Sequence, residues 1–288
     1  MIDRYLLRYF LAVIDNGTFT AAAGQVNVSQ PTLSAGIAKL EREVGGKLFR
    51  RNSQRVELTE AGARFAVHAR RIEREFHLAQ ASIAGLAPIE TLRLGVLSTL
   101  ATGELASLAD AFAGISPAIR IEFLEGNERA LAQYLARGRI DLALTILRGD
   151  NEGEPLRDEG YALALPATHP LAGEAALPAE ALAGETMIVR RHCEALAETS
   201  RYFTQRGIRP FFALRTTNDD RALAMVSAGL GVTVVPASHV HAGVVTPALT
   251  GFDLRRKIGL LWGDDTAHLR SESLPLTRIL RDRFVSPR

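Results

Sequence analysis

Apolar positions three and four residues apart run through residues 18–62 and predict two short helices joined by a tight turn. Thr18 is a suitable N-cap for the first helix, and Asn27 lies in the turn because asparagine tolerates tight backbone geometry. Ser29 is placed to cap the second helix, with Pro31 in its first turn, where a missing N–H costs nothing. The core-facing positions of that helix are Leu33, Ile37, Leu40 and Val44.

The opposite face of the second helix carries Gln30, Thr32, Ser34, Ala35 and Lys39. Short side chains near a helix N-terminus suit base edges in the major groove of double-stranded DNA. After Gly45 and Gly46, a predicted hairpin places Arg50, Arg51 and Arg55 around an Asn-Ser-Gln tip, which suits phosphate or minor-groove contact. A generic helical subdomain with solvated arginines is the alternative. The order of cap, turn, proline, apolar ridge and basic hairpin favours a winged helix-turn-helix over residues 1–58.

A second apolar pattern predicts one long helix within residues 59–88, capped by Thr59 and about 40 Å in length. Its seam consists of Phe65, Ala69, Ile72, Phe76, Ala79, Ile83 and Leu86, spaced alternately by four and three. The seam either packs on its own domain or pairs with a second copy, and the heptad regularity favours a dimer. A twofold dimer predicts an interrupted inverted repeat in the DNA.

From residue 89 to residue 288 the pattern changes to strands that alternate with helices, which predicts a parallel-rich α/β body in two lobes. Lobe I is expected at about 89–160 and 247–288, and lobe II at about 161–246. The predicted strands are 91–97, 119–126, 140–147, 161–166, 187–191, 212–217, 231–236 and 257–262. The predicted helices are 102–113, 127–137, 195–206, 219–228 and 271–285.

Ligands of open α/β sheets bind at the carboxyl ends of the strands, near helix N-termini. The loops at these ends hold Ser98 and Thr99, then Asn127, then residues 190–193, then Thr217 and Asn218. Each polar residue among them either contacts a ligand or caps a helix or turn, and both interpretations stay open for every one. Arg190 and Arg191 would supply positive charge to an acidic ligand.

Composition adds an uneven charge to this picture. Residues 1–87 hold 12 Lys or Arg and 8 Asp or Glu, a net +4, whereas residues 88–288 hold 22 and 24, a net −2. A basic head on a slightly acidic body fits DNA at one end. The sequence has no run of about 18 apolar residues and no signal-peptide layout at its start, so we expect no membrane contact and a cytoplasmic protein.

The sequence offers little support for catalysis. Cys193 is the single cysteine, so no intrachain disulfide forms, and no Cys/His cluster has zinc-site spacing. No phosphate-binding glycine loop is present, and the seven histidines show no triad spacing. We therefore expect no enzyme activity, no metal and no cofactor. An enzyme or solute carrier that uses the body, with the head as a tether, is the disfavoured alternative.

The N-terminal segment closely resembles the DNA-binding domain of LysR-type transcriptional regulators. The matching residues are Phe10, Leu11, Ala12, Val13, Gly17, Phe19, Ala22, Ala23, Val28, Ser29, Gln30, Pro31, Leu33, Ser34, Ile37, Leu40, Glu41, Gly45, Leu48, Phe49, Arg51, Leu58, Thr59, Ala61 and Gly62. By this resemblance, Gln30, Pro31, Thr32, Ser34 and Arg51 fall where the family contacts DNA. The resemblance also implies pairing through the linker helix and assembly into dimers and tetramers.

The body resembles the LysR effector domain, which has the fold of periplasmic solute-binding proteins. The resemblance rests on segments such as LGVLSTL, FLEGNERAL, ARGRIDLALTI and AGLGVTVVP. It implies that Ser98, Thr99, Asn127, Ile146 and residues 191–193 lie where relatives hold small-molecule effectors. With Asn218 from the loop argument, the candidate effector residues are Ser98, Thr99, Asn127, Ile146, Arg191, His192, Cys193 and Asn218.

His192 and Cys193 also lie where peroxide-sensing members of the family place their reactive cysteine. A neighbouring basic cluster would lower the pKa of the Cys193 thiol and raise its reactivity. With no second cysteine, modification by another thiol is the remaining route after oxidation. Cys193 alternatively serves as a small hydrophobic residue. The sequence thus predicts a transcription regulator controlled by a small effector, with RNA polymerase contact if it activates; a redox-responsive regulator is the alternative.

Overall fold

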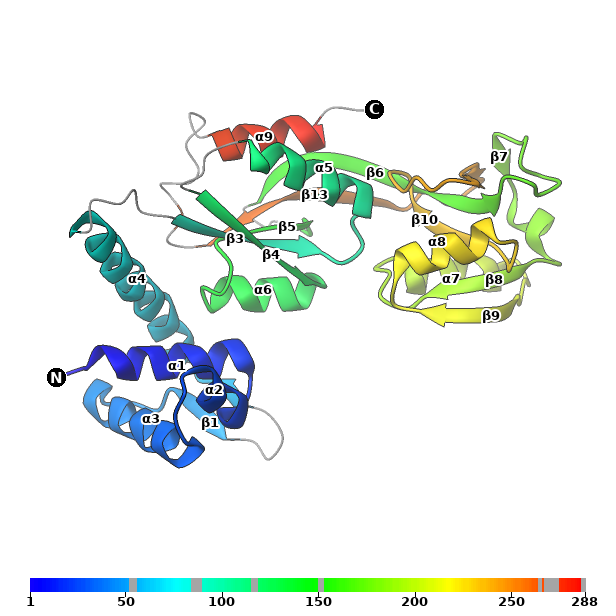
Figure 1. The fold of residues 1–288 in the computed structure, drawn as a ribbon. Coiled ribbons are helices and arrows are strands. Elements are labelled where there is room, and N and C mark those ends of the chain that lie inside the picture. The colour runs from blue at the N-terminus through cyan, green and yellow to red at the C-terminus, as the bar shows by residue number, and fades with distance from the viewer. Residues whose placement is uncertain are drawn as a thin grey trace.

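The computed structural model describes residues 1–51, 56–83, 90–114, 119–149, 153–263, 266 and 275–285. Figure 1 shows a small helical head at the N-terminus, one long helix that leaves it, and an elongated α/β body made of two lobes. The head and the long helix lie at one end of lobe I, and lobe II lies at the other end.

The head consists of α1 (Arg4–Asn16), α2 (Phe19–Gln25), α3 (Gln30–Val44) and a hairpin of β1 (Phe49–Arg51) and β2 (Val56–Leu58). Both predicted helix caps are confirmed. The backbone N–H of Ala21 donates to Thr18 Oγ1 over 3.2 Å, and that of Thr32 donates to Ser29 Oγ over 3.2 Å. Asn27 adopts a φ of +55° in the turn between α2 and α3, a left-handed conformation that asparagine tolerates better than most residues.

Aromatic rings join the head to the long helix. Phe10 of α1 lies 5.3 Å from the Phe49 ring in β1 and 5.2 Å from the Phe65 ring. Leu33, Ile37 and Leu40 are buried in the same core, as their spacing predicts. Gly62 permits the close approach of the long helix to β1, because a Cβ atom there would lie 2.1 Å from the Leu48 carbonyl oxygen.

The long helix α4 spans Glu60–Ile83, and Thr59 caps it by accepting a hydrogen bond from the Gly62 N–H over 2.9 Å. Its apolar seam divides in two. Phe65 and Ala69 pack into the core of the head, so the dimer interpretation was wrong for this first part. Ile72, Phe76 and Ile83 are 40, 44 and 89% exposed, and this second part remains available to a partner. Leu86 lies outside the described residues.

Lobe I is built from β3 (Glu90–Leu97), α5 (Thr102–Ala113), β4 (Ile119–Gly126), α6 (Glu128–Ala136), β5 (Leu142–Ile146), β13 (Arg255–Trp262) and α9 (Pro275–Val285). Strands β4, β3 and β5 are parallel neighbours, and β13 lies antiparallel to β5. Helices α5 and α9 cover one face of this sheet and α6 covers the other (Figure 1). The central strands β3 and β5 are largely buried, which explains their nearly continuous apolar sequences, whereas the edge strand β4 alternates half-buried with exposed residues.

One long strand, β6 (Glu154–Pro166), runs from lobe I into lobe II. Its first half pairs with β13, Glu159 opposite Arg256 and Gly160 opposite Arg255. Its second half pairs with β10, β11 and β12. The sequence predicts only residues 161–166 of this strand, because the preceding RDEG segment lacks the apolar character of a buried strand.

Lobe II contains β7 (Ala176–Leu177), the 3₁₀ helix η1 (Ala179–Leu182), β8 (Thr186–Arg190), α7 (Leu196–Gln205), β9 (Phe211–Thr216), α8 (Asp219–Ser227), β10 (Thr233–Pro236), β11 (Val244–Val245) and β12 (Ala248–Leu249). Alternate residues of β6 enter two cores. Tyr161, Leu163 and Leu165 pack with α7, and Ala164 packs with α8. Strands β8 and β9 are parallel.

The predicted fold class is confirmed: a helical winged head, a long linker helix and a two-lobed α/β body. The sheets are mixed rather than parallel-rich, because β6 and β13 cross between the lobes in opposite directions. The domain boundaries stay a prediction, and β12, just after residue 247, pairs with β7 on the lobe II side. Among the described residues, no helix combines the length and apolar composition that crossing a membrane requires.

Candidate functional site

The N-terminal turn of α3 presents the residues predicted to contact DNA. Gln30, Pro31 and Thr32 are exposed, and Ser34 is half-buried. The hydroxyl oxygens of Thr32 and Ser29 lie 2.7 Å apart within the cap, so the Thr32 hydroxyl already has a partner. Gln30 therefore offers the most accessible donor and acceptor pair for a base edge.

Lys39 lies farther along α3, where its ammonium group is bound to α1. Lys39 Nζ is 2.8 Å from Asp3 Oδ2 and 3.4 Å from the Tyr5 hydroxyl, and 3.8 Å from Glu43 Oε1. These contacts raise the pKa of Lys39, chiefly through the hydrogen bond to Asp3. A phosphate contact by Lys39 stays a prediction, and it requires exchange of the Asp3 carboxylate for a phosphate oxygen.

The wing is anchored by Glu41 of α3. Its carboxylate accepts hydrogen bonds from the backbone N–H groups of Leu48 (3.0 Å) and Phe49 (3.3 Å), and it pairs with Lys47 at 2.6 Å. Burial alone would raise the pKa of Glu41, but the hydrogen bonds from Lys47 and the backbone bring it below its usual value. The start of the wing is thereby fixed against the recognition helix.

The basic residues of the wing lie on and between its two strands. Arg50 is exposed on β1, and the Arg51 backbone pairs with Val56. Arg55 falls in residues 52–55, outside the described residues. The three remain predicted DNA contacts.

A buried polar cluster joins the two lobes around the carboxylate of Glu194, which follows β8 in lobe II. Glu194 Oε2 accepts a hydrogen bond from Thr99 Oγ1 of lobe I over 2.8 Å. Glu194 Oε1 accepts from the Tyr161 hydroxyl over 2.7 Å and from Arg256 Nη1 over 2.7 Å. Each of the crossing strands β6 and β13 therefore supplies one donor to the same carboxylate.

Arg256 is the centre of this cluster and is only 2% exposed. Besides Glu194, it binds Glu159 through Nε (2.9 Å), and its Nη1 donates to the Thr99 carbonyl (3.1 Å). Burial raises the pKa of Glu194, but the charge of Arg256 and the hydrogen bonds from Tyr161 and Thr99 together bring that pKa below its usual value. The pKa of Tyr161 is raised, first by burial and then by Glu194, so the phenol stays protonated and donates.

The remaining predicted effector residues have different environments. Asn127 and Asn218 are helix caps: Asn127 Oδ1 accepts from the Ala130 N–H (2.9 Å), and Asn218 Oδ1 accepts from the Arg221 N–H (2.7 Å). Ile146 is 5% exposed in the core of lobe I. The Ser98 hydroxyl is buried with no hydrogen-bond partner among the described residues, beside Thr99. Thr99 is thus the predicted effector residue that the interlobe cluster uses.

Arg191 and His192 are exposed and line a hollow on lobe II of about 400 Å³. Arg215, Arg221, Thr216 and Thr217 complete its walls. The hollow lies where β8 and β9 end, as the loop argument predicts, and it is strongly basic. Direct contact of either residue with an effector stays a prediction.

Arg190 proved to be structural in a way the sequence pattern did not reveal. It is 3% exposed, its Nε donates to Asp219 Oδ1 over 2.7 Å, and a second bond joins its Nη2 to Asp219 Oδ2. Despite burial, the pKa of Asp219 lies far below its usual value, because His239 Nε2 lies 3.7 Å from Asp219 Oδ2 and Arg190 forms the ion pair. Arg190 is therefore not a free cation for a ligand.

Cys193 lies half-buried beside this ion pair, with its Sγ accepting a hydrogen bond from Arg190 Nη1 over 3.4 Å. Burial raises the pKa of the Cys193 thiol, and the opposing effect of Arg190 is smaller. The expectation of a lowered thiol pKa was wrong. The physical reason is that the arginine charge is already neutralised by Asp219 and the sulfur is removed from water.

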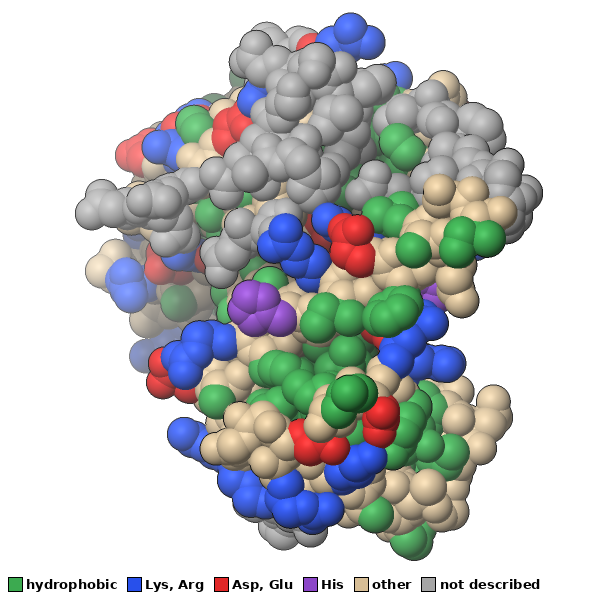
Figure 2. Space-filling model, turned by 90° about the vertical axis from the view of Figure 1, so that its left-hand side faces the viewer, with side chains coloured by type: hydrophobic (Ala, Val, Ile, Leu, Met, Phe, Trp, Pro, Cys, Tyr) green, Lys and Arg blue, Asp and Glu red, His purple; other side chains and the backbone are tan. Residues whose placement is uncertain are grey.

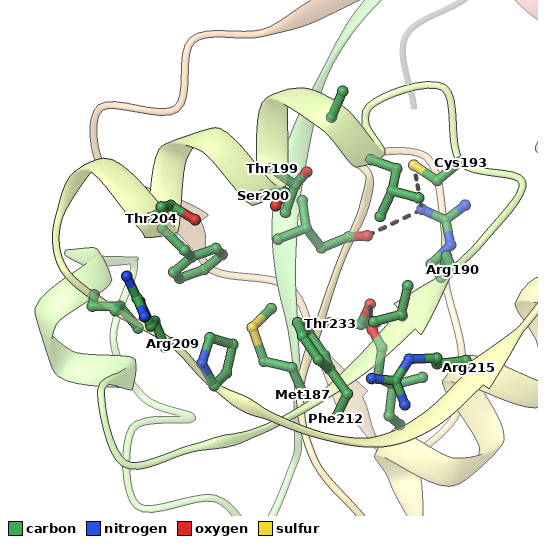
Figure 3. Close-up of a pocket in the computed structure, with 18 of the residues that line it drawn as sticks. Met187, Arg190, Cys193, Thr199, Ser200, Thr204, Arg209, Phe212, Arg215 and Thr233 are labelled. Carbon is green, nitrogen blue, oxygen red and sulfur yellow. Dashed lines mark hydrogen bonds between the residues drawn. The ribbon is translucent and has the colours of Figure 1, made fainter.

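Cys193 also borders a cavity of about 750 Å³ within lobe II, between α7 and strands β8 and β9. Figure 3 shows Cys193 and Arg190 at one end of this cavity and Thr204 and Arg209 at the other. Met187 and Phe212 contribute to its apolar lining. The cavity gives a small uncharged molecule space beside the sulfur.

Sequence reasoning missed five buried or half-buried polar residues that carry the interlobe cluster and the Arg190 ion pair: Glu159 and Tyr161 of β6, Arg256 of β13, Glu194 of the turn after β8, and Asp219 at the start of α8. The sequence signal was weak, because Glu159 and Arg256 lie just before the apolar segments that predict strands 161–166 and 257–262. Buried charges persist in proteins when they are paired, but these two positions read as exposed strand ends. Arg256 is 97 residues from Glu159 and 62 residues from Glu194 in the sequence, and pattern analysis of one chain does not connect such distant partners.

Two family models match the chain. Residues 5–63 match the bacterial regulatory helix-turn-helix protein of the LysR family, and residues 87–274 match the LysR substrate binding domain. Within the described residues, no group of three or more His, Cys, Asp or Glu side chains is arranged to hold a metal ion.

Curated relatives point the same way. A probable hydrogen peroxide-inducible genes activator of Mycobacterium avium is 33% identical over 81% of this chain and 78% of its own length. The dual regulator OxyR of Escherichia coli K12 is 30% identical over 96% of this chain and 94% of its own. A RuBisCO operon transcriptional regulator of Allochromatium vinosum is 30% identical over 86% of this chain and 84% of its own.

Solved structures share the fold over nearly the whole chain. A full-length OxyR variant from Pseudomonas aeruginosa aligns with a TM-score of 0.61 and 24% identity, covering 99% of this chain and 95% of its own. Full-length CbnR in complex with its target DNA aligns with a TM-score of 0.55 and 22% identity, covering 98% of this chain and 99% of its own. On these grounds the chain belongs to the LysR family: it is a DNA-binding transcription regulator with an effector-binding domain, and not an enzyme.

Proposed function

We propose that the protein binds an interrupted inverted repeat as a dimer and, in pairs of dimers, as a tetramer, and that a small molecule bound to the body changes this binding. The observation that carries the proposal is the exposed N-terminal turn of α3, with Gln30 at its tip, next to a half-exposed apolar face on α4. Helix α3 contacts the bases, and the apolar face of α4 pairs two copies of the head.

The pairing face combines α1 and α4. Ile2 and Tyr5 of the N-terminal segment are 42 and 45% exposed, close to the values for Ile72 and Phe76 of α4. Arg4 joins the two helices, because its Nε binds Glu73 over 2.9 Å and its guanidinium lies 4.6 Å above the Phe76 ring. Figure 2 shows hydrophobic side chains gathered on this side of the molecule, bordered by charged ones. Its occupant is a second copy, since a continuous apolar face on a long linker helix favours self-pairing.

The effector acts between the lobes, near Thr99 and the loop that holds Arg191, His192 and Cys193. Support comes from the convergence of both lobes on one buried cluster, which any change in lobe orientation must rearrange. Lobe motion reaches the head through α4, because α4 packs against α6 of lobe I. Such a regulator works in the cytoplasm, without a cofactor, and contacts RNA polymerase where it activates.

The test is selection of bound sequences from genomic or random DNA with the purified full chain. Recovery of two half-sites about one helical turn apart, or a multiple of it, is the expected result. Genes next to recovered sites then indicate effectors to test by their effect on affinity. Salt-sensitive binding without a motif would reduce the head to a nonspecific tether and overturn the proposal.

A second candidate function, a response to peroxide, is favoured by the cavity beside the Cys193 sulfur. Of the relatives named above, one is described as a probable hydrogen peroxide-inducible genes activator and another is the regulator OxyR. The Cys193 thiolate would attack hydrogen peroxide, forming the S–O bond of a sulfenic acid as the O–O bond breaks and hydroxide leaves. A low-molecular-weight thiol would then form a mixed disulfide and release water, since the chain has no second cysteine.

A reporter gene under the selected operator distinguishes the two candidates. Loss of the peroxide response in a Cys193→Ser variant that still binds DNA supports the redox function. A full peroxide response in that variant excludes Cys193 as the sensor and leaves the diffusible effector.

A further inference from the structure

The structure assigns to Thr99, Tyr161 and Arg256 a carboxylate-binding site that the chain fills with its own Glu194, so that an effector must carry a carboxylate and displace Glu194 to enter. This inference rests on the proposed function, in which an effector binds between the lobes. It adds the chemical class of the ligand and the residue with which the ligand competes.

The site has the geometry of a receptor for a carboxylate. Both oxygens of Glu194 are engaged, Oε2 by Thr99 Oγ1 (2.8 Å) and Oε1 by the Tyr161 hydroxyl (2.7 Å) and Arg256 Nη1 (2.7 Å). Two hydroxyl donors and one guanidinium around a planar anion match what a free carboxylate requires. The Glu194 side chain is 8% exposed, so its carboxylate has left water almost completely.

The site cannot hold a second anion beside Glu194. Arg256 already serves two carboxylates, Glu194 and Glu159, and Arg157 is shared between Glu159 and Glu104 at 3.2 and 2.5 Å. These five groups sum to one negative charge. Arg148 and Arg190 are also in electrostatic reach of Glu194, but Arg148 pairs with Glu128 at 2.5 Å and Arg190 pairs with Asp219. An added carboxylate would leave a buried excess charge, so it has to replace the one present.

Glu194 is suited to be replaced because it belongs to a turn rather than to an element. It lies in the segment between β8 and α7, next to the exposed His192. Two of its donors, by contrast, lie on the strands β6 and β13, and the third, Thr99, lies in the turn after β3. Withdrawal of Glu194 breaks the Thr99 bond between the lobes while the receptor keeps its shape.

The test uses the full-length Glu194→Ala variant and acetate. Alanine keeps the Cβ atom and removes the Cγ methylene with its carboxylate, and acetate supplies the same atoms as a free ion. We expect acetate to raise the Tm of this variant saturably at pH 7.5, by about 5 °C or more at a hundredfold excess over Kd. Wild type, whose site is filled, should shift by less than a fifth of that.

Three controls separate a carboxylate site from a salt effect. Sodium chloride at equal ionic strength and acetamide, the neutral isostere, should leave the Tm of the alanine variant unchanged. A Glu194→Gln variant retains the shape of the side chain and should not respond to acetate. Adding Thr99→Val to Glu194→Ala should remove most of the acetate response, since one of the donors is gone.

An equal shift in wild type and Glu194→Ala, or none in a Glu194→Ala protein with native circular dichroism and wild-type oligomeric state, overturns the inference. If the alanine variant does not fold, isothermal titration of wild type and Glu194→Gln with acetate decides instead: tight binding to wild type would contradict an occupied site. DNA selection is independent of these readouts. Its failure removes the proposed function, whereas failure of the acetate response removes only the competition by Glu194.

Discussion

The guanidinium of Arg190 lies 3.4 Å from the sulfur of Cys193, and it is simultaneously held by a bidentate ion pair with Asp219. The basic residues next to Cys193 in the sequence predict an activated thiol, but the folded structure does not provide one. Asp219 neutralises the arginine, and burial of the sulfur then has the larger effect, so the pKa of Cys193 is raised. The local surroundings therefore favour the thiol over the thiolate.

We expect Cys193 to alkylate slowly in the folded protein, because the thiolate is the nucleophile and burial makes it scarce. At pH 7.5 the reaction with iodoacetamide should be at least about tenfold slower than in urea, and it should accelerate as pH rises. Mass spectrometry of quenched samples measures both rates. Rapid alkylation of the native chain at pH 7 would contradict the raised pKa and strengthen the redox candidate.

Arg51→Ala and Gln30→Ala should weaken DNA binding in different ways. Arg51→Ala removes a predicted phosphate contact, so affinity falls on all sequences and the slope of log K against log salt decreases by about 1. Gln30→Ala removes base-edge hydrogen bonds, so binding to the selected site loses about 1–3 kcal/mol and sequence preference relaxes.

Fluorescence anisotropy at several salt concentrations measures both effects, with Arg201→Ala on exposed α7 as the matched control. Equal affinity and slope for all three variants would remove residues 18–62 from the DNA interface.

Phe76→Glu should dissociate the dimer, because it places a charge in the exposed half of the α4 seam. We expect the dimer Kd to rise roughly 30-fold or more, as for a central apolar contact. Leu230→Glu is the control, since Leu230 is 41% exposed and Phe76 is 44% exposed. Sedimentation velocity over a concentration series shows whether only the Phe76 variant shifts to monomer.

Acid should destabilise the protein partly through Glu194. Burial raises the folded pKa of Glu194, but Arg256 and the hydrogen bonds from Tyr161 and Thr99 together bring it below the unfolded value of 4.5. The stabilisation is therefore fully present above about pH 5 and is lost as pH falls through the lower folded pKa. Glu194→Gln should cost about 2 kcal/mol at pH 7 and flatten the decline in unfolding free energy between pH 5 and pH 3.

Urea titrations at each pH provide the unfolding free energies, and Glu174→Gln, at an exposed carboxylate, is the control. An unchanged pH slope in Glu194→Gln would mean that Glu159 and Asp219, whose pKa values are also lowered, carry the acid sensitivity.

The parts of the fold with local causes were predictable from the sequence. Thr18, Ser29 and Thr59 cap helices because each bonds a backbone N–H three residues later, and such contacts follow from spacing alone. The range of α5 agreed at both ends, since Ala113 precedes Gly114 and an apolar face ends there. Asn127 and Asn218 also cap helices. The sequence allowed a cap or a ligand contact at both positions and did not decide between them.

The interlobe cluster was not predictable, because its bonds depend on how distant strands align. Arg256 meets Glu159 only through the antiparallel register of β13 and β6, and meets Glu194 only after lobe II returns to the crossing. The α4 seam shows the same limit. Heptad spacing identified its apolar residues, but the packing of Phe65 against Phe10 decided which of them stay free.

The paired strands β6 and β13 have a consequence for the order in which the chain folds. The sheet of lobe I needs β13 between β5 and β6, yet β13 is synthesised after the whole of lobe II. On the ribosome the head can complete its local contacts early, while β3, β4 and β5 must wait with an open edge until residues 255–262 emerge. Truncation anywhere before β13 should therefore leave a folded head attached to an aggregation-prone, unfinished sheet.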